Sequence, residues 1–208
     1  ILNKNPYPSI RLGIFLEKVK LEAFLEFVEQ YLFPCLIDTY KIQVVIYSES
    51  EPLLETAIIQ LTLKYPKLVL GIGKCSSLSQ SHKAYKNIKF IGVQAFGRLQ
   101  TANFSLLTSL THIGNEAFGR LQTAIGFSGL TSLTHIGDKA FEDLREADFS
   151  GLTRLTHIGN EAFQSLETAD FSRLTSLTHI GNEAFWRLQT AIGFSGLGNE
   201  AFLGLREA

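Results

Sequence analysis

One phrase, Leu-Thr-His-Ile-Gly-Asn-Glu-Ala-Phe, recurs through the second half of the sequence and strongly limits the folds open to the chain. Copies that keep the Ile-Gly and Ala-Phe pairs occupy residues 88–96, 110–118, 133–141, 155–163 and 177–185, with a stub at 198–202. From one Ala-Phe pair to the next, the steps are 22, 23, 22, 22 and 17 residues. A tandem repeat of this kind predicts a stack of similar coils, each buried against its neighbours.

The repeat length and the leucine spacing identify the kind of coil. A period of about 20–29 residues with leucines three residues apart is typical of leucine-rich repeats. Within one coil, the residues predicted to point inward are Leu107, Leu110, Ile113, Ala117, Phe118, Leu121 and Ala124. The phenylalanines of the Ala-Phe pairs are predicted to stack at a strand spacing of about 4.8 Å, as an aromatic spine along the solenoid.

The whole repeated phrase resembles the BspA-like class of leucine-rich repeats, whose units carry an Ile-Gly pair followed by Ala-Phe and then Leu or Cys three residues on. The resemblance covers residues 88–208. It implies a leucine-rich repeat solenoid that binds another protein or packs into an assembly. Such repeats are associated with microbial surfaces and with large-virus genomes. The resemblance therefore also favours a location at a cell surface or in a virion over the cytoplasm. At such a location the chain would serve as structural glue.

The first 86 residues follow another pattern. Apolar runs with the length of buried strands occupy residues 10–16, 42–47 and 68–72. Amphipathic segments at residues 21–33 and 53–63 predict the helices between them. Strand, helix, strand, helix, strand is the order of a short parallel βαβαβ unit. The predicted fold class is therefore α/β, with a truncated α/β unit at residues 1–86 that caps a leucine-rich repeat solenoid at residues 87–208.

This first part resembles the opening of a nucleotide-sugar glycosyltransferase domain of the GT-A type and, more distantly, the glycosyltransferase-like domains of collagen lysyl hydroxylases. The resemblance rests on Ile-Arg-Leu-Gly-Ile-Phe-Leu-Glu, Val-Val-Ile-Tyr-Ser-Glu-Ser-Glu and Lys-Leu-Val-Leu-Gly-Ile-Gly, and it covers residues 8–86. It implies that Glu49 and Glu51 help to hold a nucleotide, although a solvated strand end also explains them. The Asp-x-Asp pair that would hold the metal does not occur in the sequence.

The sequence therefore favours a non-enzymatic scaffold. The alternatives are a glycosyltransferase-related enzyme fragment and a structural glue component of a cell surface or virus particle. Gly71 and Gly73 follow a strand, but they lack the third glycine of a dinucleotide-binding turn and do not belong to a P-loop. No cofactor is expected. Cys35 and Cys75 have no metal-ligand spacing, so buried free thiols or one disulfide explain them.

The charge and hydropathy of the sequence limit the kinds of partner that the protein can bind. The formal net charge is −1. Residues 1–86 carry 10 basic and 8 acidic side chains, and the remainder carries 9 and 12, so neither part has the basic footprint of a nucleic-acid binder. No apolar run reaches the length of about 18 residues that a membrane span needs. A sequence that begins at Ile1 without Met suggests a processed product or a piece of something longer.

Two repeated polar positions form predicted columns on the solenoid. One column consists of His112, His135, His157 and His179. A row of rings does not offer zinc a closed tetrahedron, so stacked and half-exposed imidazoles are predicted in preference to a metal site. The other column follows the Ile-Gly pairs and consists of Asn115, Asp138, Asn160, Asn182 and Asn199. These short polar side chains are predicted to bond neighbouring backbone or to tolerate a left-handed conformation in a turn.

The two positions after each Ala-Phe pair vary most, as expected for a recognition surface on a fixed frame. The candidate binding residues on this edge are Arg98, Arg120, Asp143, Trp186 and Arg187. Exposed Trp and Arg carry a disproportionate share of binding energy, so Trp186 with Arg187 is the predicted hot spot. Trp186 packed against Leu203 as a cap on the last coil is the alternative. Asn103 begins the sequence's one glycosylation sequon, which would matter on a secreted chain and is otherwise a repeat turn.

Overall fold

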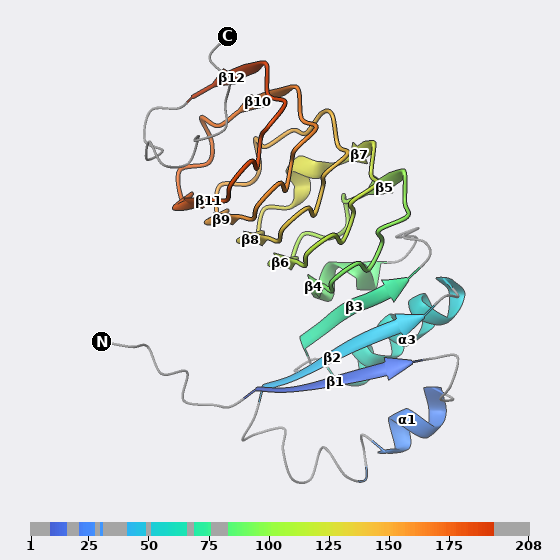
Figure 1. The fold of residues 1–208 in the computed structure, drawn as a ribbon. Helices are drawn as coiled ribbons and strands as arrows, with labels where there is room; N and C mark the ends of the chain where they lie inside the picture. The colour runs from blue at the N-terminus through green and yellow to red at the C-terminus, as the bar shows by residue number, and fades with distance from the viewer. Residues whose placement is uncertain are drawn as a thin grey trace.

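In the computed structural model, a parallel sheet runs from the first described strand to the last coils that the structure describes (Figure 1). The structure describes residues 9–15, 21–27, 30, 41–48, 51–65, 69–75 and 83–193. The sheet has eight strands in the order β1-β2-β3-β4-β6-β8-β9-β11. These strands are β1 (Ser9–Phe15), β2 (Lys41–Ser48), β3 (Val69–Cys75), β4 (Ile88–Ile91), β6 (His112–Ile113), β8 (His135–Ile136), β9 (His157–Ile158) and β11 (His179–Ile180).

The N-terminal unit has the predicted βαβαβ order. Its helical elements are α1 (Leu21–Phe27), α3 (Glu51–Lys64) and the 3-10 helix η2 (Lys83–Asn87). Strands β1, β2 and β3 pair in parallel, which confirms the α/β prediction. The helix predicted over residues 21–33 is described as far as Phe27, and most of its remainder lies outside the described residues.

Helix α3 covers one face of this unit. Its residues Leu54, Ala57, Ile58 and Leu61 are fully buried, as are Val44 and Ile46 of β2. Because side chains alternate across a strand, Val45 and Tyr47 lie on the opposite face of the sheet from α3. That opposite face continues into the solenoid, because β3 pairs with β4 in parallel across the boundary expected at residue 86. The division into two units at that boundary stays a prediction.

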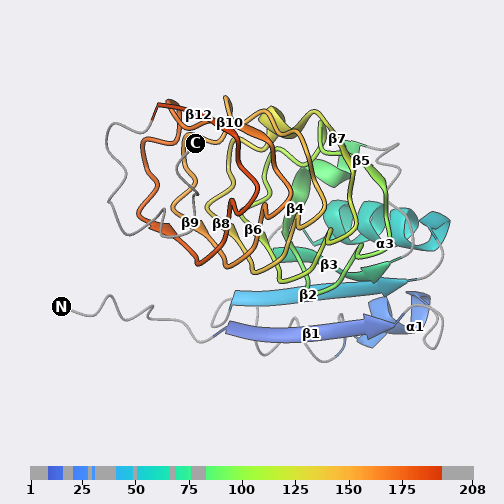
Figure 2. The same cartoon turned by 45° about the horizontal axis from the view of Figure 1, so that its top comes forward.

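The solenoid is a stack of coils, each with a short strand on one side, and all but the coil of β8 with a second short strand on the other side (Figure 2). The sheet strands β4, β6, β8, β9 and β11 form one side. The other side holds two separate two-stranded sheets and one 3-10 helix: β5 (Thr101–Asn103) with β7 (Thr123–Ile125), β10 (Thr168–Asp170) with β12 (Thr190–Ile192), and η3 (Phe127–Gly129). The predicted leucine-rich repeat solenoid is thereby confirmed.

The predicted aromatic spine is present, at a wider spacing than the strands alone suggest. Phe96, Phe118, Phe141, Phe163 and Phe185 stack in turn with ring centroids 5.3, 5.3, 5.3 and 5.6 Å apart. These distances fall within the range for offset stacking. Each ring of a second row packs edge-on against the spine, as in Phe127–Phe141 at 5.2 Å and 82°. The second row, which the sequence analysis did not predict, consists of Phe104, Phe127, Phe149 and Phe171.

One predicted inward residue is less buried than expected. Ala124 is half-buried, whereas the corresponding Ala102 and Ala169 are 2% and 6% exposed. The coil of Ala124 has the longer Thr-Ala-Ile-Gly form, which contains one extra residue. This form ends at Gly126, whose φ is 65°. The insertion leaves Ile125 51% exposed. A one-residue insertion in a coil of fixed circumference must bulge outward, and here it lifts Ala124 partly out of the core.

The Asn column links successive coils. Asn115 Oδ1 accepts a hydrogen bond from the backbone N–H of Asp138 at 3.1 Å, and Asp138 Oδ1 accepts one from the N–H of Asn160 at 2.7 Å. The predicted bonding to neighbouring backbone is confirmed. The left-handed conformation, however, falls on the next residue of each coil: Gln94, Glu116, Lys139, Glu161 and Glu183, with φ between 52° and 56°. Asn199 lies outside the described residues.

Candidate functional site

The variable positions after each Ala-Phe pair form a continuous column, here called the variable edge. Backbone hydrogen bonds join its coils: Asp143 N–H donates to Gly119 O at 3.2 Å, and Arg187 N–H donates to Gln164 O at 3.0 Å. Arg98, Arg120, Asp143 and Arg187 are all exposed. The frame is therefore fixed by backbone bonds while its side chains vary and reach solvent.

Charged groups on the variable edge have no internal partner within the described residues. The guanidinium groups of Arg98, Arg120 and Arg187 make no ion pair there, in contrast to Lys139 and Glu161, whose side chains pair at 3.0 Å. Trp186 is 45% exposed. Leu203, against which Trp186 was alternatively predicted to pack, lies outside the described residues. The binding role of these residues stays a prediction.

The four histidines form the predicted stack, here called the histidine ladder. Neighbouring ring centroids are 4.6 Å apart for His112 and His135, 5.7 Å for His135 and His157, and 4.1 Å for His157 and His179. The rings stand on β6, β8, β9 and β11, with His135 paired in register with His157. His112, His135 and His179 are exposed and His157 is half-buried. The prediction of stacked, partly exposed imidazoles is confirmed.

Hydrogen bonds determine which ring nitrogen of the first two histidines carries the proton. Thr111 Oγ1 donates its proton to Lys89 O at 2.7 Å, and Thr134 Oγ1 donates to Thr111 O at 2.9 Å. Each hydroxyl oxygen also lies 2.9 Å from Nδ1 of the following histidine. Because each hydroxyl already donates its proton to a carbonyl oxygen, Nδ1–H must be the donor in the bond between the histidine and the threonine hydroxyl. In the neutral ring, Nε2 is then the unprotonated nitrogen and the site where a proton binds.

Burial and neighbouring rings shift the acidity of the ladder. Burial, followed by the charge of His135, lowers the pKa of His112. Burial also lowers the pKa of His157, with further lowering by His179 and His135 and an opposing effect of the Asp138 carboxylate. Protonation of His112 and His157 is therefore less favourable in the folded protein than for isolated imidazoles.

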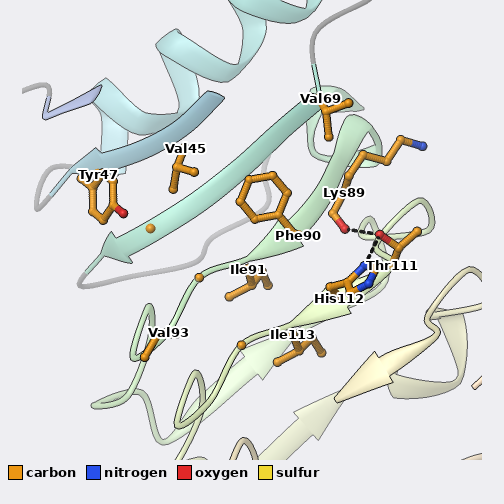
Figure 3. Close-up of a pocket in the computed structure, with 13 residues that line it drawn as sticks. Val45, Tyr47, Val69, Lys89, Phe90, Ile91, Val93, Thr111, His112 and Ile113 are labelled. Carbon is orange, nitrogen blue, oxygen red and sulfur yellow. Dashed lines mark hydrogen bonds between the residues drawn. The ribbon is translucent and has the colours of Figure 1, made fainter. Parts of the chain in front are cut away.

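A groove of about 500 Å³ lies where the N-terminal unit meets the first coils, on the sheet face opposite α3 (Figure 3). This junction groove is lined by residues of β2, β3, β4 and β6, including Val45, Tyr47, Phe90 and His112. The ring of Phe90 lies over Gly71 and the ring of Tyr47 lies over Gly73, so a side chain at either glycine would clash. These two glycines thus make room for aromatic rings from neighbouring strands.

The junction groove was missed by sequence reasoning, although a signal for it exists. Glycine inside a strand often marks close approach of another group. Gly71 and Gly73 alternate in β3, and the two neighbouring strands supply Tyr47 and Phe90. The groove could have been inferred only with the register of β2, β3 and β4, which the sequence does not specify.

The described residues do not form the nucleotide site in which the glycosyltransferase alternative places Glu49 and Glu51. Glu49 lies outside the described residues, and Glu51 is the first residue of α3. Across the described ranges, no group of three or more His, Cys, Asp or Glu side chains could hold a metal ion. In the same ranges, no helix is long and apolar enough to cross a membrane. Cys35 lies outside them, so the state of the cysteines stays open.

Asn103 of the sequon lies exposed in β5. Its Oδ1 accepts a hydrogen bond from the backbone N–H of Ser105 at 2.9 Å. Asp148 and Asp170 hold the same turn with Ser150 and Ser172 in later coils. Asn103 therefore has a structural role in a repeat turn whether or not it is modified.

The model of the BspA type leucine rich repeat region matches residues 73–192 in six copies. The match confirms the stated resemblance for residues 88–192 and extends it back to residue 73 in β3, while residues 193–208 lie outside the match. No curated protein and no solved structure matches the chain. Stacked repeats of this kind present extended surfaces for protein interaction. Since the match spans more than half of the sequence, the chain belongs to the BspA-type leucine-rich repeat family.

Proposed function

We propose that the chain is a non-enzymatic scaffold that binds a protein partner, or joins a larger assembly, through the variable edge. The observation that carries this proposal is the contrast between a uniform, hydrogen-bonded frame and the exposed, varied side chains upon it. A preordered surface loses little conformational entropy when it binds, which favours affinity. The repeated phrase itself is too uniform to discriminate between partners.

Trp186 and Arg187 are the proposed hot spot of the variable edge. The Trp186 side chain is 45% exposed, and Arg187 is exposed without an ion pair among the described residues. Binding energy concentrates on such residues when a partner excludes water from around them. We expect Trp186→Ala to weaken partner binding by about tenfold or more, and Thr131→Ala, at an exposed position away from the edge, to leave it unchanged.

The edge also indicates the charge of its partner. Arg98 and Arg120 occupy the same position in neighbouring coils, and Asp143 follows in the next. A partner surface with two acidic groups beside a basic one would complement this order. With a net charge of −1, a protein is a better fit than a nucleic acid.

Site-specific photo-crosslinking tests the proposal. A photoreactive side chain is introduced at residues 98, 120 or 187, and for comparison at Ser172, which is exposed beyond β10. In an extract of cells that make the protein, the three edge positions should capture one common protein that the position of Ser172 does not. That protein, purified, should bind the wild-type chain and bind Trp186→Ala more weakly. Equal capture from all positions, or equal affinity for Trp186→Ala, would refute the use of this edge.

The glycosyltransferase-related alternative makes an opposite expectation. If residues 8–86 retained nucleotide-sugar binding, calorimetric titration with UDP-sugars and Mn²⁺ would give metal-dependent heat with micromolar affinity. The scaffold proposal expects no such heat. The structural-glue alternative is a form of the same scaffold role. If it holds, the chain should be recovered within a large assembly instead of alone.

A further inference from the structure

We propose that the histidine ladder and the junction groove form a second binding surface, which takes an extended acidic peptide carrying an apolar side chain and binds it more tightly as the pH falls. This surface lies on the parallel sheet and shares no residue with the variable edge. It therefore stands independently of the function proposed above.

The groove and the ladder are parts of one row across the sheet. In register, Gly71 pairs with Phe90, Phe90 with His112, and His112 with His135. The row continues through His157 to His179. A peptide lying along this row, across the strands, meets the aromatic groove at one end and four imidazoles after it.

The groove suits one apolar side chain. Its lining includes the apolar or aromatic side chains of Val45, Tyr47, Val69 and Phe90, and its volume of about 500 Å³ lies in the range of small-molecule pockets. Figure 3 shows the Val45 side chain between those of Tyr47 and Phe90. An aromatic or large aliphatic residue of the peptide would bury its surface there.

The ladder suits carboxylates. For His112 and His135, the Nδ1–H is held by a threonine hydroxyl, so the added proton goes to Nε2 at the other side of an exposed ring. Protonated rings 4 to 6 Å apart repel one another, and a bound carboxylate relieves that repulsion. Alternate side chains of an extended peptide are about 6.6 Å apart. This is wider than the ring spacings of 4.1 to 5.7 Å, so carboxylates at every second residue lie over the row without pairing with each ring in turn.

Protonated imidazoles would give the row a net positive charge, because the one lysine and the one carboxylate near it offset each other. Lys89 of β4 lines the groove beside His112, is exposed and has no ion pair within the described residues. Asp138 opposes it and acts on His157. Glutamate side chains keep their charge down to about pH 4.3, so binding should strengthen between about pH 7.5 and 5.5.

Fluorescence anisotropy of a labelled peptide tests this inference. The probe is a short peptide with one phenylalanine followed by alternating threonine and glutamate, and its matched control replaces each glutamate with glutamine. The glutamate peptide should bind about tenfold more tightly at pH 5.5 than at pH 7.5, and the glutamine peptide should show no such change. The double variant His135→Gln/His157→Gln should lose most of the pH dependence but keep the affinity measured at pH 7.5.

Further variants separate the groove from the ladder and from the variable edge. Tyr47→Ala should weaken peptide binding at both pH values. If circular dichroism shows that Tyr47→Ala does not fold, Val69→Ser replaces it as the groove variant. Arg187→Ala should change nothing, so failure here and failure of the proposed edge are distinguishable. Affinity independent of pH, or a full pH response in the double histidine variant, would overturn the proposal. So would pH-dependent binding of heparin that Tyr47→Ala does not affect, or self-association of the chain at pH 5.5 in place of peptide binding.

Discussion

Asn160 Oδ1 accepts a hydrogen bond of 2.8 Å from the backbone N–H of Asn182, exactly one coil further along the solenoid. The bond continues the chain of contacts from Asn115 through Asp138, so each short polar side chain satisfies the turn of the next coil. Stability of a stacked repeat depends on such nearest-neighbour links.

We therefore expect Asn160→Ala to lower the free energy of unfolding by about 1 kcal/mol, because the Asn182 N–H loses its acceptor at a partly solvated site. Urea denaturation followed by circular dichroism measures the change. Thr175→Ala, at an exposed position in the following coil, is the matched control and should leave the midpoint where it is. An unchanged midpoint for Asn160→Ala would show that water replaces this link without cost.

The left-handed residue of each turn offers a gain in stability. Glu183 has φ 56°, a conformation that is strained for any residue with a Cβ. Glu183→Gly should raise the free energy of unfolding by about 1 kcal/mol, because it removes that strain at an exposed position. Glu167→Gly removes the same side chain where φ is not positive, so it should lower stability instead. Thermal unfolding of both variants checks the opposite signs.

Much of the solenoid could be predicted because one coil is repeated. Four copies of the phrase carry the same inward Leu, Ile and Phe, and the first copy replaces the Leu with Ile88, so a single coil defines the core of its neighbours. The second phenylalanine row was missed because Phe104 and Phe127 sit in the less regular segment, where the coil length itself varies. The left-handed turn residue was also missed, since nothing in a glutamate or lysine predicts positive φ.

The candidate surfaces were less predictable than the core. The histidine ladder followed directly from the repeat, because equal positions in stacked coils must be neighbours. The junction groove depended on register between β2, β3 and β4, which come from non-repeating sequence. A sequence repeat determines contacts between identical positions of neighbouring coils. The contact of Phe90 with Gly71 instead joins two segments of unlike sequence, so no repeat predicts it.

The glycine of each Ile-Gly pair is required by the closeness of the preceding coil. A Cβ added to Gly159 would lie 2.5 Å from the backbone nitrogen of Asp138, which cannot move without breaking the stack. Gly159→Ala should therefore cost about 1–3 kcal/mol, as expected for overpacking against a rigid neighbour. At Gly129 the nearest atom to an added Cβ is 3.7 Å away, so Gly129→Ala should be nearly neutral. Comparing the urea midpoints of the two variants checks the steric argument directly.

Acidification should destabilise the solenoid through the histidine ladder. The pKa values of His112 and His157 are lowered from the usual value of 6.5 in the folded protein, mainly by burial and then by neighbouring rings. The unfolded chain therefore binds more protons in this range, and stability is full above about pH 6.5 and falls as the pH drops through the folded pKa values. The urea midpoint should be lower at pH 5.5 than at pH 7.5.

A variant and a second pH range show whether the ladder is the cause. His112→Gln/His157→Gln should flatten the fall between pH 7.5 and 5.5, because it removes the two rings whose pKa values are lowered. Asp148 and Asp170 also have lowered pKa values, through hydrogen bonds from Ser150 and Ser172, but their usual value of 3.8 places any loss of stability at lower pH. A midpoint that stays constant in the wild-type chain, or falls equally in the double variant, would remove the ladder as the source of acid sensitivity.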